Sequence, residues 1–198
     1  MIWHRSKNYY KTKWRGNYRT DGGVLTNQGI HLLDTLIYNF GEISNFDVIA
    51  DFNKKKLQAE DLIVINFRHK SGVISNFKAT TRANQDYRSA IDVIGTKGRI
   101  IVKGISLNTF HKFSNKNLIF FKKRSEEFKL GMGPVSGMGF GHKKLLDEFL
   151  NIKLKSSKDL EIEKNYYLLK LIHSIYNEVF NKKKLNKVIN KNSLLGIK

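Results

Sequence analysis

The sequence predicts an α+β domain, a mainly antiparallel open β-sheet with helices packed on one face. One stretch near the start has helical periodicity, a long middle stretch alternates with a period of two, and helical periodicity returns toward the end. One helix, many strands and then two helices is an order typical of a sheet covered by helices on one side. A length of 198 residues with 40% hydrophobic residues is sufficient for one domain with a sizeable core.

The first helix is predicted from about Asn27 to Phe40. Its apolar residues recur at helical spacing: Leu32, Leu33, Leu36, Ile37 and Phe40. A turn at Asp21-Gly22-Gly23 precedes the helix, and Gly41 follows it as a left-handed C-terminal stop.

The middle of the chain, from Ser44 to Lys123, is predicted to form strands. They are expected at residues 46–50, 62–67, 73–77, 91–94, 100–102 and 118–121. The connections at 70–72 and 95–98 have the length of hairpin turns, so neighbouring strands should be antiparallel. We therefore expect a meander of five or more strands.

Two more helices are predicted after a glycine-rich loop at residues 131–141. The first runs through residues 145–150, and the second runs from about Glu161 to Phe180. We expect one domain over residues 1–182 and a basic C-terminal tail over residues 183–198.

The chain is strongly basic, with 36 Lys and Arg against 17 Asp and Glu and a net charge of +19. A basic nucleic-acid-binding protein is therefore an alternative, and it predicts a clustered basic face with salt-sensitive binding. However, 28 lysines, 8 arginines and 19 asparagines indicate a compositional bias at exposed positions, and the lysine clusters lack interleaved stacking aromatics. We do not expect nucleic acid as the partner. The excess of positive charge is also compatible with an electropositive entrance to a binding site for a phosphate-bearing substrate.

The composition also bounds the compartment and the chemistry. There is no cysteine, so disulfides and thiolate metal sites are excluded, and no metal site is predicted. No signal-peptide pattern opens the chain, and no apolar run approaches the roughly 18 to 20 residues of a membrane span. We expect a soluble, cytoplasmic protein without a membrane partner.

The segment from Trp14 to Asp34 contains the most specific functional motif of the sequence. Trp14-Arg15-Gly16 is followed by Asp21-Gly22-Gly23-Val24-Leu25-Thr26-Asn27-Gln28-Gly29-Ile30-His31-Leu32-Leu33-Asp34. On a helix, Asn27 and His31 stand one turn apart on one face and can touch the same ligand. Histidine is suited to removing a proton from a hydroxyl because its ordinary pKa lies near working pH. The alternative is a histidine that only packs or lies on the surface.

This string resembles the substrate-domain signature of the Gfo/Idh/MocA oxidoreductases, W-R-G-x-x-x-x-D-G-G-x-L-x-N-Q-x-I-H-x-x-D. Further similarity is carried by Tyr9-Tyr10, Glu60-Asp61, Ile94-Gly95-Thr96-Lys97-Gly98, Gly141-His142 and Ile175-Tyr176, so the resemblance covers residues 3 to 180. It implies the fold predicted above, with residues 1–182 as a substrate-binding and oligomerisation domain that forms a homo-oligomer through the sheet face.

The resemblance also implies hydride transfer between a nicotinamide and a sugar carbon, with His31 as the catalytic residue at the substrate hydroxyl. Many members have aspartate where this chain has Asn27, and asparagine can orient the sugar but cannot accept a proton. The variant Asn-Gln-Gly-Ile-His looks most like the branch that acts on UDP-activated acetamido-sugar uronates. The expected partner is therefore a sugar or nucleotide-sugar substrate.

Five residues are expected to bind that substrate: Tyr10, Trp14, Arg15, Asn27 and His142. Arg15 offers a planar fork for a carboxylate or phosphate, with a plain surface arginine as the alternative. His142 precedes a helix whose free amides could meet an anion, with capping or packing as the alternative.

The cofactor half of such an enzyme is not recognised in the sequence. The stretch Gly131-Met132-Gly133-Pro134-Val135-Ser136 has serine where a dinucleotide fingerprint needs its third glycine. The family's catalytic lysine lies in a Glu-Lys-Pro motif, whereas the only proline is Pro134, preceded by glycine. We expect NAD or NADP to serve the full-length enzyme through a missing Rossmann domain or a separate subunit, and this chain alone to bind no cofactor and be inactive. A fragment, half of a split enzyme and a catalytically idle module all fit.

Overall fold

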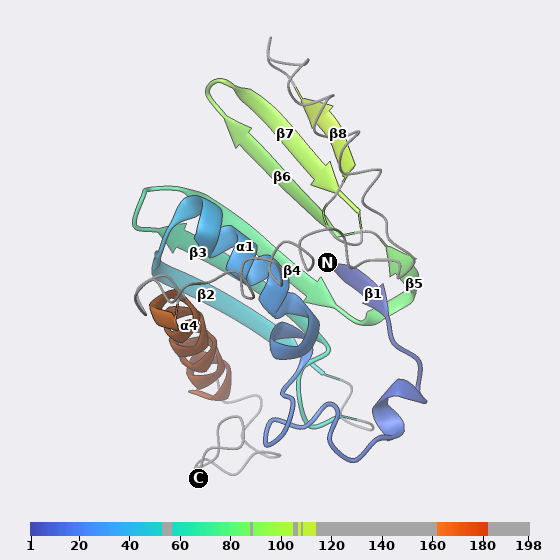
Figure 1. Cartoon of the computed structure of the whole chain (residues 1–198). Coiled ribbons are helices and arrows are strands. Elements are labelled where there is room, and N and C mark those ends of the chain that lie inside the picture. Colours follow the sequence, from blue (N-terminus) through green and yellow to red (C-terminus); the bar gives the residue numbers. More distant parts are fainter. Residues whose placement is uncertain (53–56, 88, 105–106, 108, 114–161, 182–198) are drawn as a thin grey trace, which may run out of the picture. The chain divides into compact units, whose positions relative to one another are not determined.

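A computed structural model describes residues 1–52, 57–87, 89–104, 107, 109–113 and 162–181. The chain divides into two compact units, which in the described residues are 1–87 with 162–181, and 89–113. The first unit contains a five-stranded sheet and the helices, and the second contains three strands (Figure 1). The candidate site residues that the structure describes all belong to the first unit.

The sheet of the first unit is mixed but mainly antiparallel, with the strand order β2-β3-β4-β1-β5. Its strands are β1 (Ile2–His4), β2 (Ile43–Asp51), β3 (Leu62–His69), β4 (Ile74–Thr80) and β5 (Arg82–Tyr87). β2, β3 and β4 follow one another in antiparallel register, whereas β1 lies parallel to β4 and antiparallel to β5. The short turn at residues 70–72 joins β3 to β4 as predicted.

The helices of this unit are short near the start of the chain and long near its end. A 3₁₀ turn η1 (Tyr9–Lys11) is followed by a π-helical turn η2 (Leu25–Gly29), the helix α1 (Ile30–Phe40) and, far along the chain, α4 (Ile162–Asn181). The predicted helices at 27–40 and 161–180 are confirmed, but the first begins earlier, as a π turn. Gly41 ends α1 with φ of 83°, and its N–H donates to the carbonyl of Ile37.

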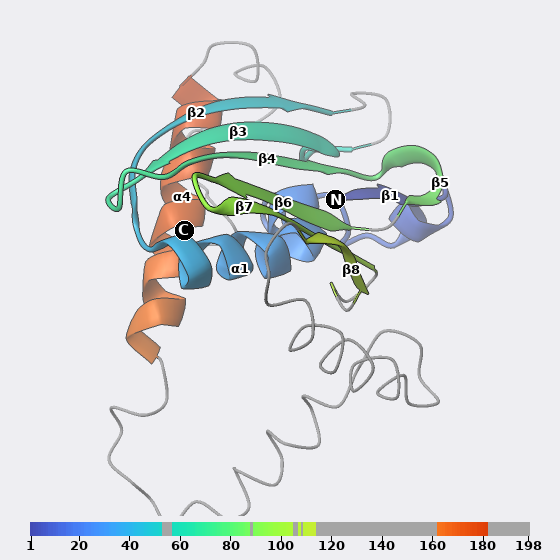
Figure 2. The ribbon, with the colours of Figure 1, turned by 90° about the horizontal axis from the view of Figure 1, so that it is seen from above.

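One face of the sheet is buried, and the helices pack against it. Along β3 the alternate residues Ile63, Ile65, Phe67 and His69 are buried, while Asn66 and Arg68 point outward and are exposed. The end of α1 meets this face, where the ring centroid of Phe40 lies 5.8 Å from that of His69. α4 packs on both β2 and α1, with three fully buried residues, Ile172, Ile175 and Tyr176. The prediction of helices on one face is confirmed, and Figure 2 shows α1 running beside the strands.

The second unit contains β6 (Ala90–Gly95), β7 (Gly98–Lys103) and β8 (Thr109–Phe113) in an antiparallel sheet with the order β6-β7-β8. The hairpin turn between β6 and β7 is confirmed. The prediction of one continuous meander is wrong, because β1 occupies the edge of β4 and the later strands form a sheet of their own. The predicted strand 118–121, helix 145–150, glycine-rich loop and tail lie outside the described residues. No described helix is both long and apolar enough to cross a membrane.

Candidate functional site

The turn at Asp21–Val24 is held in place by Glu60, whose buried carboxyl lies far along the chain from it. Gly22 adopts φ of 69°, a left-handed conformation that favours glycine. At Gly23 an added Cβ would lie 2.0 Å from Glu60 Oε2, so only glycine fits. The N–H of Val24 donates to the Glu60 carbonyl at 2.8 Å, and the N–H of Leu25 donates to Glu60 Oε1 at 2.9 Å. Glu60 therefore holds the start of the helix that carries the candidate residues.

Glu60 is enclosed on all sides. Oε1 also accepts a hydrogen bond from the Tyr176 hydroxyl at 3.0 Å, and the Glu60 N–H donates to Tyr18 Oη at 3.2 Å. Oε2 is buried and has no hydrogen-bond partner in the part of the chain that the structure describes. Burial raises the pKa of Glu60 to about 7, although the surrounding hydrogen bonds oppose the rise. The pKa values of Tyr18 and Tyr176 are raised well above their ordinary range by burial and by the nearby carboxyl.

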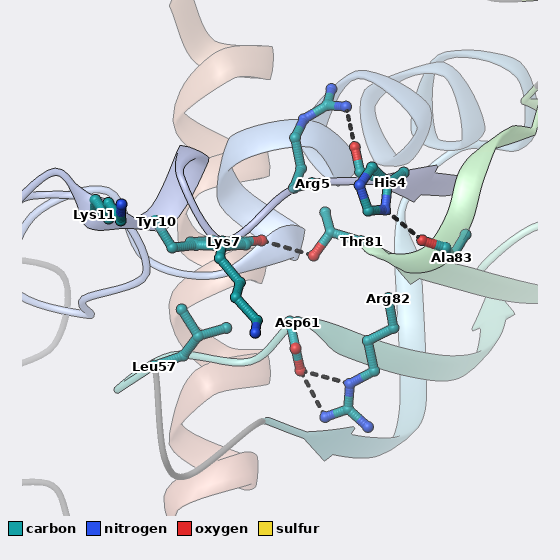
Figure 3. Close-up of a pocket in the computed structure, with 10 residues that line it drawn as sticks. All are labelled: His4, Arg5, Lys7, Tyr10, Lys11, Leu57, Asp61, Thr81, Arg82 and Ala83. Carbon is teal, nitrogen blue, oxygen red and sulfur yellow. Dashed lines mark hydrogen bonds and ion pairs between the residues drawn. The ribbon is translucent and has the colours of Figure 1, made fainter.

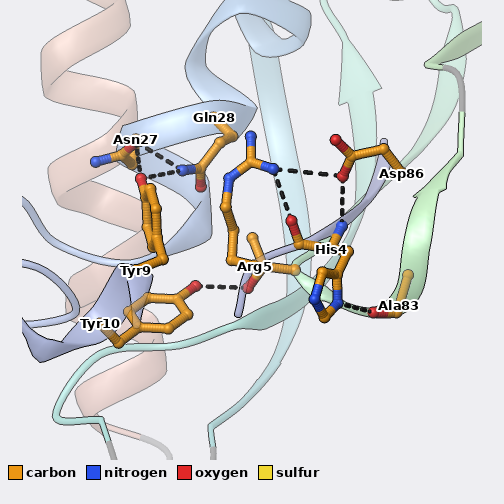
Figure 4. A network of polar contacts seen from close by, with 9 residues as sticks. His4, Arg5, Tyr9, Tyr10, Asn27, Gln28, Ala83 and Asp86 are labelled. Atoms are coloured by element: carbon orange, nitrogen blue, oxygen red, sulfur yellow. Dashed lines mark hydrogen bonds and ion pairs between the residues drawn. The ribbon is translucent and has the colours of Figure 1, made fainter. Parts of the chain in front are cut away.

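Asn27 lies in η2 with both ends of its amide engaged. Nδ2 donates to Asp21 Oδ2 at 3.0 Å. Oδ1 accepts from Gln28 Nε2 at 2.7 Å and from the Tyr9 hydroxyl at 3.3 Å, and Figure 4 shows these two bonds. Gln28 also donates to Tyr9 Oη at 2.9 Å. Burial raises the pKa of Asp21, against hydrogen bonds that lower it. The Asn27 side chain is therefore held in one orientation.

Tyr9 connects Asn27 to Arg15 and Trp14. The Arg15 guanidinium lies 3.9 Å from the centroid of the Tyr9 ring and 4.6 Å from that of Trp14, within cation–π range. Arg15 also donates through Nη1 to the Tyr9 carbonyl at 3.4 Å, and its Nε is buried without a partner among the described residues. Trp14 is 47% exposed. Sequence reasoning singled out the three partners but not Tyr9 itself, although the Tyr9-Tyr10 pair was part of the matching pattern.

His31 lies in the first turn of α1 and is exposed. Its carbonyl accepts a hydrogen bond from Thr35 Oγ1 at 2.7 Å, but within the described ranges its ring takes part in no hydrogen bond or ion pair. His69 behaves differently, since it is buried and both ring nitrogens are bonded, to the Gly41 carbonyl and to Ser75 Oγ. Of these two histidines, His31 is the one whose ring can reach a ligand.

Tyr10 lines a cavity of about 560 Å³ (Figure 3). Its hydroxyl lies 2.6 Å from Thr81 Oγ1, and burial raises its pKa. The structure therefore gathers Trp14, Arg15 and Asn27 around Tyr9, whereas Tyr10 lines this cavity and those three do not. His142 lies outside the described residues. No cluster of His, Asp and Glu suited to a metal ion is present in the described part of the chain.

The fold and the site define an α+β domain whose mixed, mainly antiparallel sheet supports a polar cluster at the start of its first helix. The family described as "GFO/IDH/MocA C-terminal domain" matches residues 1–101, half of the chain. The chain therefore belongs to the Gfo/Idh/MocA oxidoreductase family, and the predicted family and fold class are confirmed.

Named relatives agree with this assignment. Myo-inositol 2-dehydrogenase of Thermotoga maritima is 27% identical over 169 residues, which cover 69% of this chain and 51% of that protein. The WlbA dehydrogenase of Bordetella pertussis, solved with NADH and UDP-GlcNAcA, has a TM-score of 0.75 at 23% identity, covering 91% of this chain and 52% of that one. An NAD-binding oxidoreductase from Klebsiella pneumoniae has a TM-score of 0.65 at 14% identity, covering 92% and 56%. The two structural likenesses show the fold, and the chain spans about half the length of these relatives.

Proposed function

We propose that the chain is the substrate-binding half of an NAD(P)-dependent dehydrogenase for a sugar or nucleotide sugar. Two observations carry the proposal: the amide of Asn27 is fixed by three neighbours, and the exposed ring of His31, four positions further along the chain, has no partner in the described structure. One is oriented in advance and the other is available, which suits a residue that positions a hydroxyl and a residue that takes its proton.

Oxidation of a sugar alcohol to a ketone removes a hydride from carbon and a proton from the hydroxyl. The histidine ring of His31 is assigned the proton, because a neutral imidazole can accept it near neutral pH. Asn27 is assigned the orientation of the sugar: its Oδ1 already accepts two hydrogen bonds, but the second N–H of its amide can still donate to a hydroxyl without a change of charge. Arg15 is assigned an anionic group of the substrate, since its buried Nε lacks a partner among the described residues.

The hydride acceptor implied by the family is a nicotinamide. The described residues contain no strand, glycine-rich turn and helix in the parallel arrangement that holds a dinucleotide. We assign them no contact with the cofactor and derive no step through it. Their contribution is to bind and orient the sugar and to accept the hydroxyl proton.

Calorimetric titration of the chain with UDP-N-acetylglucosamine uronate tests the proposal. We expect binding that His31→Ala and Asn27→Ala each weaken by about tenfold, the loss of roughly one hydrogen bond to a polar ligand. Asn39→Ala is the matched control, because Asn39 is exposed at the far end of α1 and bonds only the Thr35 carbonyl among the described contacts.

Absence of sugar binding in a well-folded sample would refute the proposal and favour a module that only assembles subunits. Binding that Asn39→Ala weakens as much as His31→Ala would place the ligand elsewhere on the helix. Binding of NAD by this chain alone would contradict the expectation that the cofactor half lies outside it.

A further inference from the structure

We infer that the cavity beside Tyr10 binds a diphosphate group, the nucleotide portion of the substrate; this rests on the proposed function. The cavity lies where the segment after β1 passes the ends of β3 and β4, and Figure 3 shows Lys7, Tyr10 and Arg82 on its walls. Its volume of about 560 Å³ is within the range of small-molecule sites.

The walls of the cavity carry more positive than negative charge. Four cations line it, Arg5, Lys7, Lys11 and Arg82, against a single carboxylate, Asp61. Arg82 is already committed, because its Nε donates to Asp61 at 2.7 Å and its Nη1 pairs with Asp51 at 2.9 Å. Arg5 pairs with Asp86 at 3.3 Å.

The two lysines on the wall of the cavity have no ion-pair partner among the described residues. Lys7 and Lys11 are exposed and form no salt bridge within the described residues. Lys7 and Lys11 come from one short segment, and both face the same cavity as the committed arginines. A ligand with two adjacent negative charges satisfies them together, and a diphosphate is the commonest such group on an activated sugar.

The hydroxyls of Tyr10 and Thr81 add a neutral donor to this wall. They lie 2.6 Å apart, so one donates to the other and the acceptor of the pair keeps a proton that points elsewhere. Both residues line the cavity. The remaining O–H can donate to a phosphate oxygen, as hydroxyl and lysine donors do together at phosphate sites.

The cavity is connected to Asn27 through the adjacent residues Tyr9 and Tyr10. The rings of Tyr9 and Tyr10 meet edge to face with centroids 5.0 Å apart, and the Tyr9 hydroxyl is the one that donates to Asn27. Arg5, on the wall of the cavity, has its guanidinium 5.4 Å from the centroid of the Tyr9 ring. A sugar at Asn27 and a diphosphate at the lysines would thus lie on the two sides of this tyrosine pair. Figure 4 shows the Tyr9 hydroxyl directed to Asn27 and the Tyr10 hydroxyl directed elsewhere.

The test is calorimetric titration of the full chain with four probes: UDP, inorganic pyrophosphate, N-acetylglucosamine uronate without its nucleotide, and NADH. The double variant Lys7→Ala/Lys11→Ala should weaken UDP and pyrophosphate about tenfold or more, and the free sugar acid hardly at all. Lys7→Arg/Lys11→Arg should restore most of the affinity. Lys13→Ala/Lys97→Ala removes the same net charge from residues that do not line the cavity, and it should change UDP binding less than twofold.

The outcomes separate this inference from the proposed function. Loss of sugar binding in His31→Ala with UDP binding intact supports two adjacent subsites. UDP binding that is absent from the parent chain, or equal in Lys7→Ala/Lys11→Ala, overturns the diphosphate site while leaving the sugar site to its own test. Equal weakening by the Lys13/Lys97 control would reveal a general charge effect and also overturn it. A lysine effect on NADH but not on UDP would assign the cavity to the cofactor instead.

Discussion

The burial of Glu60 predicts how the free energy of unfolding depends on pH. Its pKa is about 7 in the folded chain, against an ordinary value of 4.5. Between those two values the folded state keeps the proton while the unfolded state has lost it, so the folded state binds more protons and stability must fall as pH rises. The difference between a pKa of 4.5 and one of about 7 corresponds to about 3 to 4 kcal/mol. Above about pH 7 to 8 both states are ionised and the decline ends.

Urea unfolding followed by tryptophan fluorescence measures this decline in the right unit, since both tryptophans, Trp3 and Trp14, lie in the first unit. We expect the free energy of unfolding to drop by about 2 to 3 kcal/mol between pH 5 and pH 8 because of this one group. Glu60→Gln cannot ionise, yet its amide oxygen can still accept from Leu25 and Tyr176. The variant should therefore lose that share of the pH dependence and gain on the parent as pH rises.

Glu42→Gln is the matched control, because Glu42 is an exposed carboxylate paired with Lys70. It should keep the slope of the parent chain. If the stability of Glu60→Gln has the same pH dependence as that of the parent chain, then Glu60 is not the buried acid that the structure indicates.

Three further predictions concern packing and the site. Gly23→Ala should destabilise the first unit by about 3 kcal/mol or more, because the added Cβ would lie 2.0 Å from a buried carboxyl oxygen and 2.4 Å from a backbone oxygen. Gly41→Ala is the comparison: the space around Gly41 is open, but its φ is 83°. In the same unfolding assay this variant should cost only about 1 kcal/mol. Ile172→Ala, at a fully buried position, should cost about 2 to 5 kcal/mol, and a loss under 1 kcal/mol would contradict the packing of α4 on the sheet. Tyr9→Phe removes the hydroxyl that bonds Asn27 but keeps the ring, so calorimetry should show weaker sugar binding by about fivefold with little change in stability.

Elements with a clear period were predictable from the sequence, and elements without one were not. β3 begins with four apolar residues and then alternates, and β4 carries Phe77 and Ala79 two positions apart; both strands were predicted, although each ends two or three residues later than expected. β1 has only three residues, and β5 is polar and mostly exposed, so neither shows a period of two. β1 forms because its neighbours β4 and β5 supply pairing from about 80 residues away. Such pairing leaves no local signal.

The same division holds at the candidate site. One contiguous sequence motif contains the turn glycines, Asn27 and His31, so these residues could be recognised from the sequence. The role of Glu60 depends on a hydrogen bond from the Leu25 N–H, 35 positions earlier in the chain, and nothing in the acidic pair Glu60-Asp61 indicates that the carboxyl of Glu60 is buried. Which of the adjacent tyrosines bonds Asn27 is decided by the 3₁₀ turn η1, which sends Tyr9 and Tyr10 in different directions. The catalytic and binding roles of these residues stay predictions.

The contact between Tyr176 and the motif turn has a consequence for biosynthesis. The Tyr176 hydroxyl donates to Glu60 and accepts from the N–H of Gly23, a residue made 153 positions earlier. As the chain leaves the ribosome, β2, β3 and β4 can pair as hairpins soon after synthesis, but the turn stays without this support until α4 has emerged. A chain shortened ahead of α4 would keep every described candidate side chain and lose the buried hydroxyl that orders their scaffold.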